Sequence, residues 1–122
     1  MDRFEALKSK LETFVSDRDW QQFHSPKNMA TCIAVEAGEL LEHYTWLKDG
    51  FESGPDSAEA PDKSVVSAEA ADVFLSLLSF CRVLDIDLLS VTEAKLASLS
   101  KRYPVETAKG SAAKAPMSDD RG

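Results

Sequence analysis

Several common structural signatures are missing from the sequence. Only five glycines occur among the 122 residues, and they form no glycine-rich phosphate loop. No segment of useful length alternates apolar and polar residues as a β-strand does, and no internal repeat is present. These absences leave an all-α protein as the expected class.

Cysteines and long apolar runs are also scarce. The two cysteines, Cys32 and Cys81, lie in helical patterns beside apolar neighbours, which favours reduced core thiols over a disulfide or a metal site. No apolar run reaches the ~18 residues of a membrane span, and residues 1–5 do not resemble a signal peptide. We therefore expect a cytoplasmic protein with no membrane partner.

Positive charge is in short supply, because the formal net charge is -7 at pH 7. This balance argues against a nucleic-acid polymer as the main partner. An acidic protein can still bind a small phosphate ligand when a divalent cation lies between them. The charge therefore leaves metal-assisted phosphate binding open.

Helical periodicity is what the sequence does contain. It covers four segments: 2–16, 26–48, 63–84 and 88–102. Ser25 and Pro26 are typical of an N-cap and a first helical position, and Asp49–Gly50 should end the second helix. We expect a bundle of four or five helices over residues 1–105, followed by a small, polar and disordered tail over 106–122.

The third helical segment is apolar nearly all round, so it should be buried on most sides. Its polar residues share one narrow stripe: Glu69, Asp72, Ser76 and Ser79. A chain of this size has too little mass to cover such a helix completely. We therefore expect a homodimer at least, and a dimer of dimers as the fuller assembly.

Two pairs of carboxylates stand where the helices should be apolar. Glu36 and Glu39 lie on the core side of the second helix, and Glu69 and Asp72 lie on the third. Spacing of i, i+3 places both members of a pair on one helix face. Four buried carboxylates repel one another unless a cation neutralises them, and oxygen ligands without His or Cys suit Mg²⁺ or Mn²⁺.

Two other interpretations compete with this metal site. Pairs of acidic residues at this spacing are common on solvated helix faces, and Glu42 is an example. A di-iron carboxylate bundle requires Glu-x-x-His on two helices, and neither His24 nor His43 has that spacing. The position of the two pairs on apolar stripes favours the hard cation.

Cations and aromatic residues surround these pairs in the sequence. Lys95 and Arg102 share a face of the fourth helix and could hold a phosphate beside a metal, whereas Lys101 fits a helix C-terminus. Aromatic and imidazole rings flank the second helix at both ends: Trp20, Phe23, His24 and Trp46. Most such rings are core residues, but two tryptophans near a polar site could form a stacking slot for a base.

The segments "RDWQQFHSPKNMATCIAVEAGELLEHYTW", "EAADVFLSLLSF" and "KLASLSKRYP" resemble the MazG-like all-α nucleotide pyrophosphohydrolases, within them the short branch that includes dCTP pyrophosphatases. The resemblance covers residues 4–104. It implies hydrolysis of nucleoside triphosphates to monophosphate and pyrophosphate by a dimer or dimer-based tetramer.

The resemblance also implies roles for individual residues. Mg²⁺ would be bound by four carboxylates: Glu36, Glu39, Glu69 and Asp72. The base would contact Trp20, His24 and Trp46, and the phosphates would contact Lys95 and Tyr103. Either the metal or a carboxylate would activate the water that attacks the α-phosphorus, and Glu36 and Glu39 are the candidate bases.

The sequence departs from relatives at three motif positions. Relatives commonly read "KMDxNxxRYP", but this chain has Ala97 in place of Asp and Leu99 in place of Asn. Ser76 stands where some dCTP-specific relatives carry Tyr. These departures bear on substrate choice and turnover.

Three functions therefore remain open. The first is an Mg²⁺-dependent pyrophosphohydrolase that clears unwanted or modified nucleotides, with dCTP or a modified pyrimidine dNTP as a candidate substrate. The second is a nucleotide-binding module without turnover, which Leu99 favours. The third is a helical interaction protein with structural carboxylates.

Overall fold

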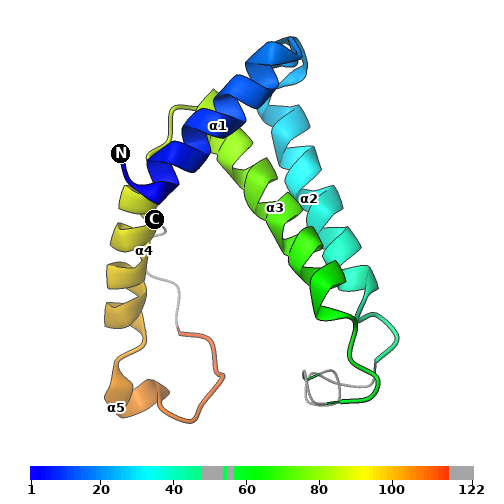
Figure 1. Ribbon diagram of the computed structural model, residues 1–122. Helices are drawn as coiled ribbons and strands as arrows, with labels where there is room; N and C mark the ends of the chain where they lie inside the picture. Colours follow the sequence, from blue (N-terminus) through cyan, green and yellow to red (C-terminus); the bar gives the residue numbers. More distant parts are fainter. Residues whose placement is uncertain (48–53, 55–56, 116–122) are drawn as a thin grey trace. The chain divides into compact units, whose positions relative to one another are not determined.

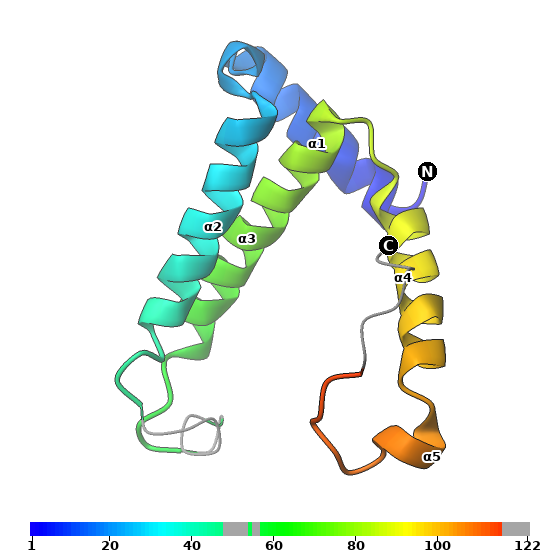
Figure 2. The ribbon, with the colours of Figure 1, turned by 180° about the vertical axis from the view of Figure 1, so that it is seen from behind.

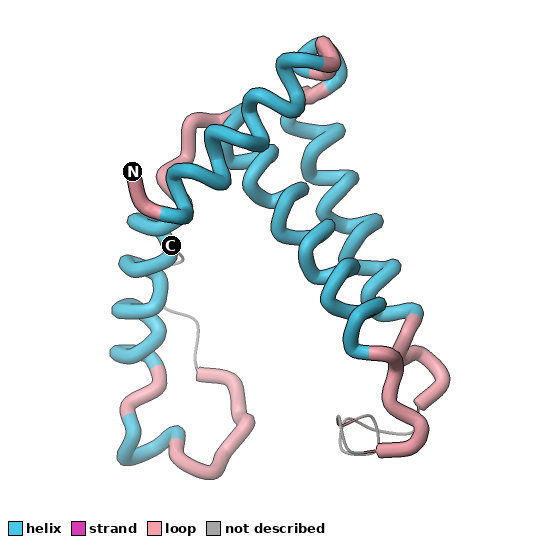
Figure 3. Tube along the Cα trace, in the orientation of Figure 1, coloured by secondary structure: helices cyan, strands magenta, loops and turns pink. Residues whose placement is uncertain are grey.

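The computed structural model describes residues 1–47, 54 and 57–115. Every regular element in this part of the chain is a helix (Figure 3), which confirms the predicted all-α class. The chain divides into two compact units, Met1–Asp85 and Ile86–Gly122.

The first unit contains three α-helices and a short 3₁₀ helix. These are α1 (Arg3–Asp17), η1 (Gln21–Phe23), α2 (Pro26–Glu42) and α3 (Lys63–Val83). α2 and α3 run antiparallel and pack side by side, and α1 contacts α3 (Figures 1 and 2). The α2–α3 pair therefore brings residues more than 30 positions apart in sequence into contact.

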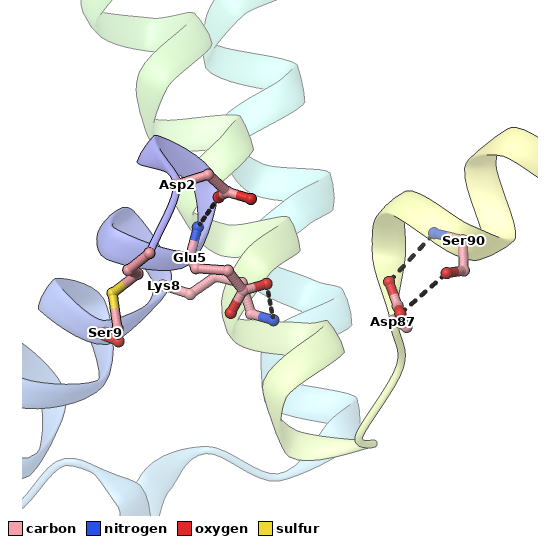
Figure 4. Close-up of polar contacts among 7 residues, drawn as sticks. Asp2, Glu5, Lys8, Ser9, Asp87 and Ser90 are labelled. Carbon is pink, nitrogen blue, oxygen red and sulfur yellow. Dashed lines mark hydrogen bonds and ion pairs between the residues drawn. The ribbon is translucent and has the colours of Figure 1, made fainter.

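Side-chain caps fix where these helices begin. The Asp2 carboxylate accepts a hydrogen bond of 2.8 Å from the Glu5 N–H at the start of α1 (Figure 4). The Ser25 hydroxyl accepts one of 3.1 Å from the Asn28 N–H, and Pro26 is the first residue of α2. Both contacts satisfy N–H groups that the first turn of a helix leaves unpaired. The start predicted for the second helix at Ser25 and Pro26 is confirmed.

The end of α2 differs from the prediction. The helix ends at Glu42, whereas we expected it to reach about Lys48. The backbone tightens there, since the Tyr44 N–H donates to the Leu41 carbonyl at 2.8 Å, one residue closer than in an α-helix. The predicted stop at Asp49–Gly50 lies outside the described residues.

The second unit contains α4 (Leu88–Arg102) and α5 (Val105–Ala108). The bounds of α4 match the predicted fourth helix. The Asp87 carboxylate caps it by accepting hydrogen bonds from the Ser90 N–H at 3.1 Å and from the Ser90 hydroxyl at 2.9 Å (Figure 4).

Part of the predicted disordered tail has local structure. α5 includes Glu106, and the Ala115 N–H donates a hydrogen bond of 2.9 Å to the Tyr103 hydroxyl. Residues 116–122 lie outside the described part of the chain. The division into a domain of residues 1–105 and a tail of 106–122 stays a prediction.

The single chain has a small core. Among the described residues, the buried side chains are few: Val15, Met29, Leu78, Ser79 and Cys81. Within the first unit α3 is not buried on most sides, since Phe74 remains 39% exposed; a chain of this size was expected to be too small to cover this helix completely. Cys32 is exposed rather than a core thiol, and only Cys81 fits that expectation. The reason is that α3 has α2 along one face and only a brief contact with α1.

α3 also meets a simple criterion for a membrane span, although the sequence has no uninterrupted apolar run of that length. Its 21 residues include an 18-residue window with a mean hydropathy of 1.5, enough by length and composition to cross a membrane. The core helix of a soluble protein can meet the same criterion. α3 carries Glu69 and Asp72 on its polar stripe, and intramembrane carboxylates are costly, so the criterion alone is weak evidence for a membrane span.

Candidate metal site and adjoining cavity

The antiparallel pairing of α2 and α3 brings three predicted metal ligands together. One carboxylate oxygen from each of Glu36, Glu69 and Asp72 lies within 4.8 Å of the other two. Glu36 comes from α2, and Glu69 and Asp72 come from successive turns of α3. We call these three residues together with Glu39 the acidic cluster. The i, i+3 spacing seen in the sequence is what directs both pairs toward the neighbouring helix.

Glu39 joins the cluster through Glu36. Burial is the main factor that raises the pKa of Glu36, and hydrogen bonding with Glu39 raises it further. The negative charges of Glu39, Asp72 and Glu69 add to the rise. A raised carboxyl pKa means that the site favours neutralisation, which either a proton or a bound cation can supply.

Two buried carboxylate oxygens without hydrogen-bond partners indicate that the cluster fits a hard cation. Oε2 of Glu36 and Oε2 of Glu69 are buried, and neither has a hydrogen-bond partner in the described part of the chain. Buried carboxylate oxygens without partners are costly. An oxygen-only donor set of this kind suits Mg²⁺ or Mn²⁺. Asp72 is exposed, so a cation held here would remain open to a ligand on that side.

His43 is a neighbour of the cluster that the sequence did not predict. Nε2 of His43 lies 3.4 Å from Oε1 of Glu69. His43 is four residues after Glu39, so the two side chains lie on the same helix face. This is the face directed toward α3. The spacing of four residues from Glu39 is the sequence signal for this position. A neighbouring imidazole of this kind can orient a carboxylate that binds a metal.

A cavity of about 190 Å³ lies beside the acidic cluster in the same unit. Trp20 and His24 both line it, as the base-pocket hypothesis requires, and its wall also includes Cys32 and Ser76. Cys32 is four residues from Glu36, and Ser76 is four from Asp72. Four residues rise about 6 Å along a helix axis, so roughly one turn separates the cavity wall from the acidic cluster on both helices.

The cavity wall is largely apolar and aromatic. Phe14 and Trp20 meet edge to face, with their ring centroids 5.6 Å apart and their planes at 79°. The Arg18 guanidinium carbon lies over the Phe14 ring, 3.8 Å from its centroid. The cavity is smaller than the roughly 300–1,000 Å³ typical of sites for drug-sized ligands, so its size fits one ring system rather than a whole nucleotide.

His24 is held by a residue that the sequence analysis did not single out. Nη2 of Arg82, in the last turn of α3, lies 2.9 Å from Nδ1 of His24. Burial lowers the pKa of His24, and the charge of Arg82 lowers it further. No local pattern links the two residues, which are 58 positions apart.

The other predicted site residues are not among those that line the cavity. Trp46 is 92% exposed and is not among the residues that line the cavity. Lys95, Arg102 and Tyr103 belong to the second unit, on α4 and at its C-cap. There the Arg102 guanidinium lies 5.6 Å from the centroid of the Tyr103 ring. The predicted roles of these four residues in substrate binding stay predictions.

Comparisons with known proteins agree with this arrangement. No family model matches the sequence. The chain is 34% identical over 101 residues to dCTP pyrophosphatase 1 of Rattus norvegicus and 33% identical over the same length to the Homo sapiens protein of that name. These matches cover 83% of the chain but 59% of each relative, so the chain spans about three fifths of the length of the curated relatives it matches.

A solved structure extends the comparison to the fold. A pyrophosphatase from Archaeoglobus fulgidus superposes with a TM-score of 0.75 at 30% sequence identity. The match covers 85% of this chain and 94% of that one. Taken with the acidic cluster, these similarities identify the chain as a member of the MazG-like, dCTP pyrophosphatase-like family.

Proposed function

We propose that the chain is an Mg²⁺-dependent pyrophosphohydrolase that converts a nucleoside triphosphate, with dCTP or a modified pyrimidine dNTP as the leading candidate, to the monophosphate and pyrophosphate. The observation that carries the proposal is the acidic cluster with two buried, unpartnered carboxylate oxygens, one helical turn from an aromatic cavity. The names of the similar proteins support the reaction class.

In this proposal, the residues of the first unit divide the substrate between them. Glu36, Glu39, Glu69 and Asp72 would hold Mg²⁺, with Mn²⁺ as the alternative ion. When bound, the ion supplies positive charge that stabilises the developing charge on the phosphate oxygens. Trp20 would stack on the base in the cavity, and His24 would contact its edge.

Hydrolysis itself needs a base and a nucleophilic water. The water oxygen forms a bond to the α-phosphorus, the bond from that phosphorus to the bridging oxygen breaks, and pyrophosphate leaves. A carboxylate of Glu36 or Glu39 would accept the water proton. The raised pKa of Glu36 favours proton uptake by its carboxylate.

The remaining predicted residues belong to the same proposal. Lys95, Arg102 and Tyr103 would bind the phosphates, with the guanidinium suited to two oxygens at once. Trp46 would add a second aromatic surface for the base. Its 92% exposure in the single chain means that a ligand or another copy of the chain would have to cover it in that role.

A homodimer or a dimer of dimers is the proposed assembly. In the first unit Phe14, Val65 and Phe74 are 44%, 42% and 39% exposed, and in the second unit Val91 and Leu96 are 51% and 65% exposed. So much apolar surface on both units calls for a covering partner, and a second copy is the partner that the size of α3 led us to expect. The proposed protein acts in the cytoplasm, with no nucleic-acid polymer or membrane as partner.

A second candidate function is nucleotide binding without turnover. Leu99 lies on α4 at the position where relatives commonly carry Asn, and Ala97 replaces the usual Asp. Neither side chain can hydrogen bond to a phosphate. This interpretation keeps the cavity and the cation but predicts no release of pyrophosphate.

One experiment separates these functions. The purified protein is incubated with each of the common dNTPs and 5-methyl-dCTP in Mg²⁺, in Mn²⁺ and in EDTA, and pyrophosphate release is measured. We expect release from a pyrimidine dNTP with either cation and none in EDTA. Thermal stabilisation by a nucleotide without release would support the second function, and neither effect would leave a helical interaction protein.

A further inference from the structure

The contact between Arg82 and His24 joins two segments that the first unit brings together at one end of the α2–α3 pair. His24 is the C-cap of η1, one residue before the Ser25 cap of α2, and Arg82 is in the last turn of α3. Their contact of 2.9 Å between Nη2 and Nδ1 is partly buried. His24 lines the cavity, so Arg82 reaches the cavity only through this ring.

The contact has one consistent assignment of protons. A guanidinium can only donate hydrogen bonds, so Nδ1 of His24 must accept and cannot carry a proton. A neutral imidazole with an unprotonated Nδ1 carries its proton on Nε2. We propose that Arg82 is a positioning residue that holds His24 as the neutral Nε2–H tautomer, so that the ring donates a hydrogen bond to an acceptor on a nucleobase in the cavity. This inference rests on the proposed function, which places the base there.

The surroundings of the pair support a fixed contact. Arg82 is half-buried, and its Nε is buried with no hydrogen-bond partner among the described residues, so this side of the guanidinium faces protein rather than solvent. A half-buried cation disfavours a second positive charge on the ring beside it. The lowered pKa of His24, caused first by burial and then by Arg82, agrees with a neutral ring.

A donor at this position selects among ligands. The Nε2–H group pairs with a carbonyl oxygen or an unprotonated ring nitrogen, both of which cytosine presents, and not with an exocyclic amino group. A site built to pair with an acceptor discriminates against a ligand that presents a donor there, because two buried donors would be left unpaired. Arg82 would therefore influence base selection without touching the base.

Nuclear magnetic resonance of the free protein tests the tautomer directly. Protein labelled with ¹⁵N in histidine, without metal or nucleotide, gives signals from only two rings, and His43→Asn identifies which is which. Long-range ¹H–¹⁵N correlations then report which nitrogen is protonated. We expect Nε2–H alone for His24 in the wild type and in Arg82→Lys, which keeps a donor. In Arg82→Met we expect changed His24 shifts and a detectable fraction of rings with a proton on Nδ1, because no donor then excludes a proton from that nitrogen.

The matched control is Arg3→Met, which removes an exposed arginine from α1 and should leave the His24 signals unchanged. A wild-type His24 with its proton on Nδ1, or an Arg82→Met protein with unchanged His24 signals, would overturn the proposal. If Arg82→Met fails to fold, the wild-type spectrum still decides, because Nδ1–H is incompatible with the contact to Arg82.

Kinetics with dCTP tests the link to the base. Loss of one oriented hydrogen bond should raise KM roughly fivefold to tenfold in Arg82→Met and leave kcat within about twofold, because the change lies in base binding rather than in hydrolysis. Arg82→Lys should restore most of the loss. An unchanged KM in Arg82→Met would overturn the role in base binding.

The two measurements also keep this inference separate from the proposed function. Hydrolysis by a wild type whose His24 is the Nδ1–H tautomer would refute the positioning role and leave the function standing. An Nε2–H tautomer in a protein that neither binds nor hydrolyses any dNTP would refute the proposed function, and the role of His24 toward a base with it.

Discussion

Asp72 is the exposed member of the acidic cluster, and its carboxylate lies within 4.8 Å of two others. Its effect on stability should depend on what neutralises the cluster. Without a cation the carboxylates repel one another, so Asp72→Asn removes a repulsive charge. With a cation bound, the same change removes a ligand and weakens the stabilisation that binding supplies.

The prediction for Asp72→Asn is therefore a change of sign. Relative to the wild type, the variant should melt at an equal or higher temperature in EDTA and at a lower temperature in excess Mg²⁺. Thermal unfolding of both proteins in both conditions checks this. A cluster that is purely structural would give destabilisation in both conditions, with melting curves that do not respond to Mg²⁺.

His24 carries a second residue-scale prediction, on pH. Its pKa in the folded protein lies below the ordinary value of 6.5, so the unfolded chain binds the proton first as pH falls. Stability from the neutral ring is present above pH 6.5 and should be lost as pH falls through the lowered pKa. Melting curves in EDTA between pH 8 and pH 5 should show a smaller loss for His24→Asn than for the wild type. An identical loss in both proteins would contradict a neutral His24 ring held beside Arg82.

For individual residues, the sequence predicted which side chains could bind a metal better than it predicted which side chains contact one another. The carboxylates were identifiable because Glu36 and Asp72 interrupt apolar stripes, which is a local pattern. The contacts of His43 with Glu69 and of Arg82 with His24 join residues on different elements. Their proximity depends on the register of α2 against α3, and no periodicity within either helix determines that register.

At the scale of the helices, α2 carries Glu36 and Glu39 of the acidic cluster. Its start depends on Ser25, whose hydroxyl accepts from the Asn28 N–H at 3.1 Å. Ser25→Ala should lower the free energy of unfolding by about 1 kcal/mol, because an N–H group of the first turn loses its partner. Urea unfolding checks the value, with Ser9→Ala on the exposed face of α1 as the control. An equal effect of the two substitutions would contradict the capping role.

The residues at which helices begin were more predictable from the sequence than the residues at which helices end or the degree to which a helix is buried. Ser25–Pro26 and Asp87 are chemical signals for caps, and both occur where the structure begins a helix. The end of α2 at Glu42 has no such signal, since apolar spacing continues through Tyr44 and Leu47 while the backbone changes to tighter turns. The exposure of α3 could not be read from its composition, because burial depends on how many partners surround it.

For the whole molecule, exposed apolar side chains lead to a prediction about mass. Phe74 on α3 and Leu96 on α4 are 39% and 65% exposed in one chain, and covering such surface stabilises an assembly in proportion to the area buried. Multi-angle light scattering at micromolar concentration should give a mass of two or four chains. A mass equal to one chain of 13.4 kDa would contradict the proposed assembly.

The central claim is that the acidic cluster of α2 and α3 holds the divalent cation used for nucleotide hydrolysis. Two glutamates on α2 provide a matched pair for testing it. Glu36 is in the cluster and has a buried, unpartnered oxygen, whereas Glu42 is exposed at the end of the same helix. A Glu→Gln change at either position removes one charge and keeps the side-chain size.

The most direct measurement is pyrophosphate release from dCTP by the wild type, Glu36→Gln and Glu42→Gln over a titration of Mg²⁺. Glu36→Gln should lose about a hundredfold or more of the activity, because it lacks both a ligand and a candidate base, while Glu42→Gln should match the wild type. Far-UV circular dichroism should show both variants folded. Equal activity of Glu36→Gln and Glu42→Gln at every Mg²⁺ concentration would contradict the account.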